Sequence, residues 1–197
     1  MRNAFARSLT RLASYYSDLM LLSGDIGNRL FDDFKNHYPK NFINCGVAEA
    51  NMTGVAAGLA MSGMRPITYT ITPFNTWRCL EQIRLDICYQ SLPVIIVGVG
   101  SGLAYANLGA SHQATEDLAL MQALPSLTVL SPADSGEVDL ALEAALALAA
   151  PVYLRLGKKG EPSVPELKRD KFAIGEVWYC KPVQTLCYSP PVSPCLL

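Results

Sequence analysis

The chain has 197 residues, of which 50% are hydrophobic and 17% are charged, and its formal net charge is -1. This length suits one domain with its own core, and the near-neutral charge gives no electrostatic basis for binding nucleic acid or an anionic membrane. No apolar run approaches the ~20 residues of a membrane-spanning helix, and the N-terminal residues lack the apolar core of a signal peptide. Because Cys45, Cys79 and Cys88 lie in apolar or helical contexts typical of reduced thiols, we expect a cytoplasmic protein.

Helical and strand-like segments alternate along the chain. Apolar residues at helical spacing predict helices over residues 3–17, 28–36, 48–62, 74–90, 114–123 and 134–148. Short apolar or β-branched runs predict strands at residues 19–22, 41–44, 66–71, 93–99, 127–130 and 151–155. This alternation predicts an α/β fold, a three-layer sandwich in which helices cover both faces of a mainly parallel sheet.

Ligand sites in such folds lie at the carboxyl ends of the strands. The features that fall at this edge are Asp25, Glu49, the segment after Ile71, the Gly-, Ala- and Ser-rich loop of residues 100–112, and Arg155. Their gathering at one edge is the main functional signal that the residues give by themselves.

Glu49 is the most informative of these residues. It follows an apolar strand where a helix of small residues begins, and almost no neutralising partner is nearby in sequence. Burying such an acid as a charge is costly, so chains keep such groups mostly where chemistry needs them. The other interpretation is a solvated acid in the first turn of a helix, which is common.

Four segments resemble, in order and spacing, the transketolase family of thiamine-diphosphate enzymes. They are the glutamate motif at residues 46–60, Thr72–Arg78, Gly109–Gln113 and Leu130–Asp134. The resemblance covers roughly residues 1–162 and implies the pyrimidine-binding domain, with the strongest likeness to C-terminal subunits of split transketolases. We expect residues 163–197 to be a linker and an atypical tail, rich in Cys and Pro from Trp178 onward.

The resemblance implies the role of each site residue. In this family a glutamate hydrogen-bonds N1′ of the cofactor's aminopyrimidine and so helps the cofactor to lose its C2 proton. Glu49 would have to keep its proton near neutral pH, which requires desolvation to outweigh the effect of the helix N-terminus. Phe74 would pack against the aminopyrimidine, His112 would face C2 and the substrate oxygens, and Asp25 would lie near the thiamine.

The residues alone leave other interpretations open. Phe74 could belong to the core, His112 could cap the following helix, and Asp25 could be an ordinary turn acid. Arg2 and Arg155 match family arginines that hold the phosphate of a sugar-phosphate substrate, but surface arginines are common. The chain also departs from transketolases at Leu108, where the family has an acidic residue, and it has no histidine near Gly100. Both departures bear on sugar specificity.

The chain lacks the Gly-Asp-Gly…Asn signature that holds Mg²⁺ and the diphosphate. The resemblance therefore implies a partner, a diphosphate-binding transketolase subunit, in a homodimer or heterotetramer, and no metal site in this chain. The predicted function is transfer of a two-carbon ketol unit between sugar phosphates. The alternatives are the E1 β subunit of a 2-oxoacid dehydrogenase, a 1-deoxyxylulose-5-phosphate synthase-like protein, and a non-catalytic assembly subunit or inactive fragment.

Overall fold

The computed structural model describes residues 1–27, 29–164 and 172–175. Its strands form one parallel sheet in the order β2-β1-β3-β4-β6-β5. The strands are β1 Leu19–Ser23, β2 Phe42–Asn44, β3 Arg65–Ile71, β4 Ile95–Val99, β5 Thr128–Leu130 and β6 Val152–Leu156. The α-helices are α1 Arg2–Leu12, α2 Asp32–His37, α3 Glu49–Met61, α4 Leu80–Gln82, α5 Asp117–Gln122 and α6 Ser135–Ala147.

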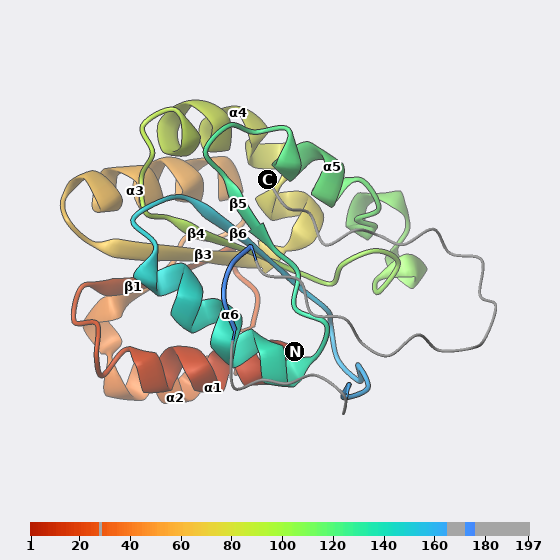
Figure 1. Cartoon of the computed structure of the whole chain (residues 1–197), viewed down its shortest axis with the longest axis horizontal. Coiled ribbons are helices and arrows are strands. Elements are labelled where there is room, and N and C mark those ends of the chain that lie inside the picture. The colour runs from red at the N-terminus through yellow and green to blue at the C-terminus, as the bar shows by residue number, and fades with distance from the viewer. Residues whose placement is uncertain (28, 165–171, 176–197) are drawn as a thin grey trace.

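Helices cover both faces of the sheet (Figure 1). On one face α1, α2 and α6 pack against alternate strand residues such as Leu21 and Tyr69. On the other face α3, α4 and α5 pack against the intervening residues, among them Leu22 and Ile96. Because both faces are covered, β1 and β4 are buried along their whole length, which is why they form continuous apolar runs in the sequence. The predicted α/β class, three layers and parallel sheet are confirmed.

Helix α3 follows the prediction closely and ends in a glycine cap. Small buried residues, Ala56, Ala57 and Ala60, let it approach the sheet. Gly63 then adopts φ +86°, and its N–H donates to Ala60 O while Met64 N–H donates to Leu59 O. This pattern satisfies the last carbonyl groups of the helix and favours glycine at that position.

The predicted helix over residues 74–90 is wrong in detail. The segment consists of the 3₁₀-helices η2 Thr72–Asn75 and η3 Trp77–Cys79, then α4, then the π-helix η4 Ile83–Cys88. The buried Asn75 side chain donates to Thr68 O and Val97 O, which ties the first turn to the sheet. Thr76 then leaves the helical region at φ -125° and ψ -83°, so a single continuous α-helix cannot form.

Most of the predicted tail, residues 163–197, lies outside the described residues, so the domain boundary at residue 162 stays a prediction. Within the described ranges, no helix is both long enough and apolar enough to cross a membrane.

Candidate functional site

Four neighbouring loops bring the predicted residues to one edge of the sheet. Asp25 follows β1, Glu49 lies beyond β2, Phe74 follows β3, and His112 lies in the loop after β4. Arg155 is the penultimate residue of β6 and is in register with Gly98 of β4. All five therefore belong to the carboxyl-terminal edge, where ligands bind in parallel α/β sheets.

Glu49 is almost completely buried, with 1% of its surface exposed. Its Oε2 accepts a hydrogen bond of 2.6 Å from Nη1 of Arg78, whose side chain is 43% exposed. Gly24 makes room for this carboxyl group, since a Cβ at Gly24 would lie 3.3 Å from Glu49 Cγ and 3.0 Å from Thr70 Oγ1. Glu49 is thus not a solvated first-turn acid, and its charge has a partner that lies 29 residues later in the chain.

Arg78 also connects Glu49 to two aromatic rings. Its Cζ lies 4.3 Å from the centroid of the Phe74 ring, a cation–π contact. The Phe74 and His112 rings meet edge to face with centroids 5.0 Å apart. Glu49, Arg78, Phe74 and His112 therefore form a continuous row of side chains along the sheet edge, here called the edge row.

The segment that carries Phe74 and Arg78 is anchored on both sides. Asn75 donates to Thr68 Oγ1 at 3.1 Å and to Val97 O at 2.9 Å, which fixes it to β3 and β4. The Cys79 thiol donates to Phe74 O. Burial raises the pKa of Cys79, and the nearby Glu49 charge raises it further, so the thiol stays protonated and keeps this bond. Composition and periodicity give no direct signal for the role of Asn75.

His112 is oriented by its own loop. Ser111 Oγ lies 2.9 Å from His112 Nδ1, and the Tyr105 ring lies 6.3 Å from the imidazole ring. The Tyr105 ring packs against Gly100, where φ is +83° and a Cβ would collide with it. Because α5 begins only at Asp117 and has no side-chain cap, His112 does not cap that helix.

Asp25 lies outside the edge row. It is exposed, adopts φ 56°, and accepts a hydrogen bond of 2.9 Å from Asn44 Nδ2. The same Asn44 side chain accepts from Gly46 N–H. Asp25 thus steadies the loop ahead of Glu49, and its predicted contact with the thiamine stays a prediction.

Arg155 belongs to a separate buried network. Its Nε donates to Asp117 Oδ2 at 2.7 Å and its Nη2 lies 3.2 Å from Asp117 Oδ1. The Tyr153 hydroxyl donates to the same carboxylate at 2.7 Å. Asp117 is 0% exposed, and burial together with its charge raises the pKa of Tyr153 well above the ordinary value. The sequence holds one signal for this network, since Tyr153 and Arg155 share a strand face and need a buried partner.

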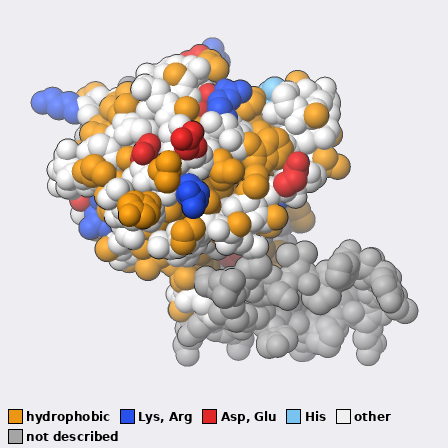
Figure 2. Space-filling model, turned by 90° about the horizontal axis from the view of Figure 1, so that it is seen from above, with side chains coloured by type: hydrophobic (Ala, Val, Ile, Leu, Met, Phe, Trp, Pro, Cys, Tyr) orange, Lys and Arg blue, Asp and Glu red, His pale blue; other side chains and the backbone are white. Residues whose placement is uncertain are grey.

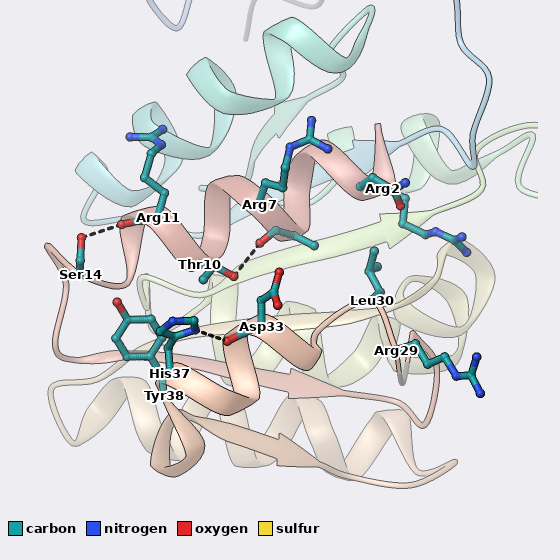
Figure 3. Close-up of a pocket in the computed structure, with 12 residues that line it drawn as sticks. Arg2, Arg7, Thr10, Arg11, Ser14, Arg29, Leu30, Asp33, His37 and Tyr38 are labelled. Atoms are coloured by element: carbon teal, nitrogen blue, oxygen red, sulfur yellow. Dashed lines mark hydrogen bonds between the residues drawn. The ribbon is translucent and has the colours of Figure 1, made fainter.

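Arg2 lines a groove on the other layer of the molecule, between α1 and α2 (Figure 3). The groove has a volume of about 850 Å³, and its arginines are Arg2, Arg7, Arg11 and Arg29. Arg11 pairs with Glu143 at 2.7 Å, whereas the other three form no ion pair within the described part of the chain. In Figure 3 the Arg2 and Arg29 side chains extend toward the same end of the groove. None of the residues that line the groove belongs to the edge row.

Two further observations concern metal ligands and the surface of the molecule. Among the described residues, no three His, Cys, Asp or Glu side chains come together in a way that could hold a metal ion. The face formed by α3, α4 and α5 carries many hydrophobic side chains among few charged ones (Figure 2). The large exposed hydrophobic residues of these and adjoining segments include Val47, Val55, Met61, Leu85 and Tyr89.

Comparison with known proteins identifies the family. The family model described as the transketolase pyrimidine-binding domain matches residues 1–162. A subunit of the apulose-4-phosphate transketolase from Phocaeicola vulgatus is 32% identical over 89% of this chain and 56% of its own length. The 6-deoxy-6-sulfo-D-fructose transketolase subunit SqwH from a Clostridium species is 34% identical over 87% of this chain and 51% of its own.

A solved structure described as a split-gene transketolase, an inactive beta4 tetramer, superposes with a TM-score of 0.79. It is 37% identical and is matched over 89% of this chain and 56% of its own. The chain thus spans about half the length of these relatives. On the match across residues 1–162, the chain belongs to the transketolase family, as a pyrimidine-binding domain.

Proposed function

We propose that this chain is the pyrimidine-binding subunit of a thiamine-diphosphate-dependent, transketolase-like transferase. The proposed reaction moves a two-carbon ketol unit between sugar phosphates. The observation that carries the proposal is Glu49, which is 1% exposed at the carboxyl edge of a parallel sheet and is linked through Arg78 to Phe74. A buried acid beside an aromatic face is the environment that an aminopyrimidine requires.

The chemistry of the edge row suits that ring. An aminopyrimidine needs a carboxyl group near its plane and an aromatic side chain against its face, and Glu49 and Phe74 offer both. The guanidinium of Arg78, itself planar and rich in N–H groups, already touches both side chains. When bound, thiamine diphosphate supplies the carbon nucleophile that the protein by itself lacks.

The protein's own residues would bind the cofactor and move protons. Glu49 would hold a proton at N1′, and its burial would keep water from competing for that hydrogen bond. Phe74 would set the plane of the ring. Ser111 engages Nδ1 of His112, which leaves Nε2 as the nitrogen that would exchange a proton with a substrate oxygen.

The substrate phosphate would bind to arginine. The groove supports Arg2 as a residue that would bind this phosphate. Its neighbours Arg7 and Arg29, like Arg2, form no ion pair within the described ranges. Arg155 has Nε and Nη2 committed to Asp117, so Nη1 would make its predicted contact with phosphate. A guanidinium suits this task because it donates two parallel hydrogen bonds.

A second chain would complete the enzyme. Its relatives are named as subunits and this chain matches about half of their length. We therefore propose that a diphosphate-binding transketolase subunit holds Mg²⁺ and the diphosphate, in a homodimer or heterotetramer in the cytoplasm. The hydrophobic face of α3, α4 and α5 supports an interface of this kind (Figure 2).

Reconstitution with a diphosphate-binding transketolase chain tests this proposal. Ketol transfer between sugar phosphates should require both chains, and Glu49→Gln should lower kcat by at least about hundredfold, the scale of a lost proton-transfer group. Glu143→Gln is the matched control because Glu143 is exposed on α6, on the face of the sheet opposite to the proposed interface. Turnover by the chain alone, or full activity of the Glu49→Gln complex, would refute the proposal.

A further inference from the structure

Arg78 makes the two contacts that the proposed function assigns to the aminopyrimidine ring. It donates to the Glu49 carboxylate at 2.6 Å, and it lies 4.3 Å from the centroid of the Phe74 ring. A guanidinium and an aminopyrimidine are both planar and both form hydrogen bonds at their edge. The two groups therefore match the same pair of side chains.

We propose that Arg78 is a positioning residue that occupies Glu49 and Phe74 in competition with the cofactor's pyrimidine ring and turns to solvent when that ring binds. This inference rests on the proposed function. Arg78 would keep Glu49 oriented and its charge compensated until the ring takes its place.

The contacts of Arg78 suit a side chain that can leave. Its side chain is 43% exposed, so part of it already contacts water. Within the described part of the chain, its one side-chain hydrogen bond is to Glu49 and its cation–π contact is with Phe74. Arg155, by contrast, is 19% exposed and is held by two hydrogen bonds to Asp117 and one to Ala114 O.

The exchange of partners also explains how one carboxyl group can be stable before and active after binding. A carboxylate that is buried at 1% exposure is costly without a counter-charge. When Arg78 leaves, the carboxyl oxygen that it held is free to bond with the ring that takes its place.

Calorimetric titration of the full chain with thiamine tests the inference, because thiamine carries the pyrimidine ring and needs no diphosphate site. If Arg78 competes, Arg78→Met should bind thiamine at least about tenfold more tightly than the wild type, the effect of one hydrogen bond to a charged group. Arg78→Lys, which can still pair with Glu49, should stay near the wild-type affinity. Arg84→Met is the control because Arg84 is exposed and forms no ion pair within the described ranges.

A second measurement needs no variant. In a ¹⁵N-labelled chain, the side-chain NMR signals of Arg78 should move toward those of a free arginine as thiamine is added, while those of Arg84 stay in place. Unchanged or weaker binding by Arg78→Met, or Arg78 signals that do not respond to saturating thiamine, would overturn the competition.

Failure of the proposed function gives a different pattern. In that case thiamine would bind to none of the variants, or Glu49→Gln would bind it as tightly as the wild type. Thiamine binding that depends on Glu49 but is not improved by Arg78→Met would refute the inference about Arg78 and leave the proposed function intact.

Discussion

Two carboxylates in this protein are equally buried but are held in opposite ways. Asp117 is 0% exposed and receives hydrogen bonds from Arg155 and from the Tyr153 hydroxyl. Glu49 is 1% exposed and, among the described residues, receives one side-chain hydrogen bond, from the half-exposed Arg78. Both charges are compensated, yet only Asp117 has both oxygens engaged by buried or nearly buried donors.

The difference separates a structural acid from one that a ligand can reach. A carboxylate whose two oxygens both accept hydrogen bonds has little capacity left for another partner, and removing one of its partners leaves an unsatisfied buried group. A carboxylate that is held by one exposed arginine can change partner without that penalty. Substitutions at these two acids and their neighbours, and a change of pH, test this contrast.

Asp117→Asn should have the largest effect on stability. The change leaves Arg155 without its counter-charge at 19% exposure, and an amide cannot accept all three hydrogen bonds. Breaking a buried ion pair in this way costs about 3–5 kcal/mol, to be measured as the free energy of unfolding in urea. A loss below about 1 kcal/mol, no more than for the exposed control Glu81→Gln, would mean that Asp117 is not a structural acid.

Tyr153→Phe should cost less, because one hydrogen bond to a charged group is lost and the ring stays in place. Such a bond contributes about 1.5–3 kcal/mol, and its length here is 2.7 Å. Urea unfolding of Tyr153→Phe and of Tyr15→Phe, in which the changed hydroxyl group belongs to an exposed ring, gives the comparison. Equal losses in the free energy of unfolding would show that the Tyr153 hydroxyl does not stabilise the protein through Asp117.

Alkaline pH should weaken both regions, but over different ranges. Burial raises the pKa of Cys79 above 9.0 and that of Tyr153 above 10.0. In each case the native state keeps a proton that the unfolded state loses, so stability is full below the ordinary pKa and falls above it. The slope is at most about 1.4 kcal/mol per pH unit for each group.

Urea unfolding at increasing pH separates these two contributions. Cys79→Ala should make the decline that begins near pH 9.0 less steep, and Tyr153→Phe should do the same for the decline that begins near pH 10.0. Burial also raises the pKa of Cys45, of Cys88 (to about 11) and of Tyr69, and these groups contribute equally in all variants. If Tyr153→Phe declines as steeply as the wild type above pH 10.0, the phenol is not protected as described.

Glu49→Gln should have the smallest effect on stability. The amide oxygen can still accept the bond from Arg78, and Arg78 is already half solvated, so we expect a change below about 1 kcal/mol. The same urea experiment as for Asp117→Asn measures it. A loss in the free energy of unfolding as large as that of Asp117→Asn would show that Glu49 is also a structural acid. The two carboxylates would then not differ in the way described.

Much of the fold could be predicted because it depends on local patterns. Strands that are buried on both faces, such as β4, form continuous apolar runs, and the small residues of α3 with Gly63 at its end define that helix. Once the alternation of strands and helices is known, parallel pairing places Glu49, Phe74 and His112 at one edge. Family resemblance then supplied the proposed roles.

The partners of the buried acids could not be predicted in this way. Arg78 lies 29 residues after Glu49 and Arg155 lies 38 residues after Asp117, and periodicity does not report contacts over such separations. The segment after β3 also combines 3₁₀, α and π turns. A uniform helical period therefore does not describe this segment.

The anchoring of Asn75 affects how fast Glu49 could exchange one partner for another. Its side chain joins the turn between Phe74 and Arg78 to β3 and β4 through Thr68 and Val97, so this backbone moves with the sheet. Any exchange of partners at Glu49 then requires only rotation about the side-chain bonds of Arg78. Such rotations take picoseconds to nanoseconds in exposed residues, whereas loop opening takes nanoseconds to microseconds. The site would respond to a ligand on the faster of these scales.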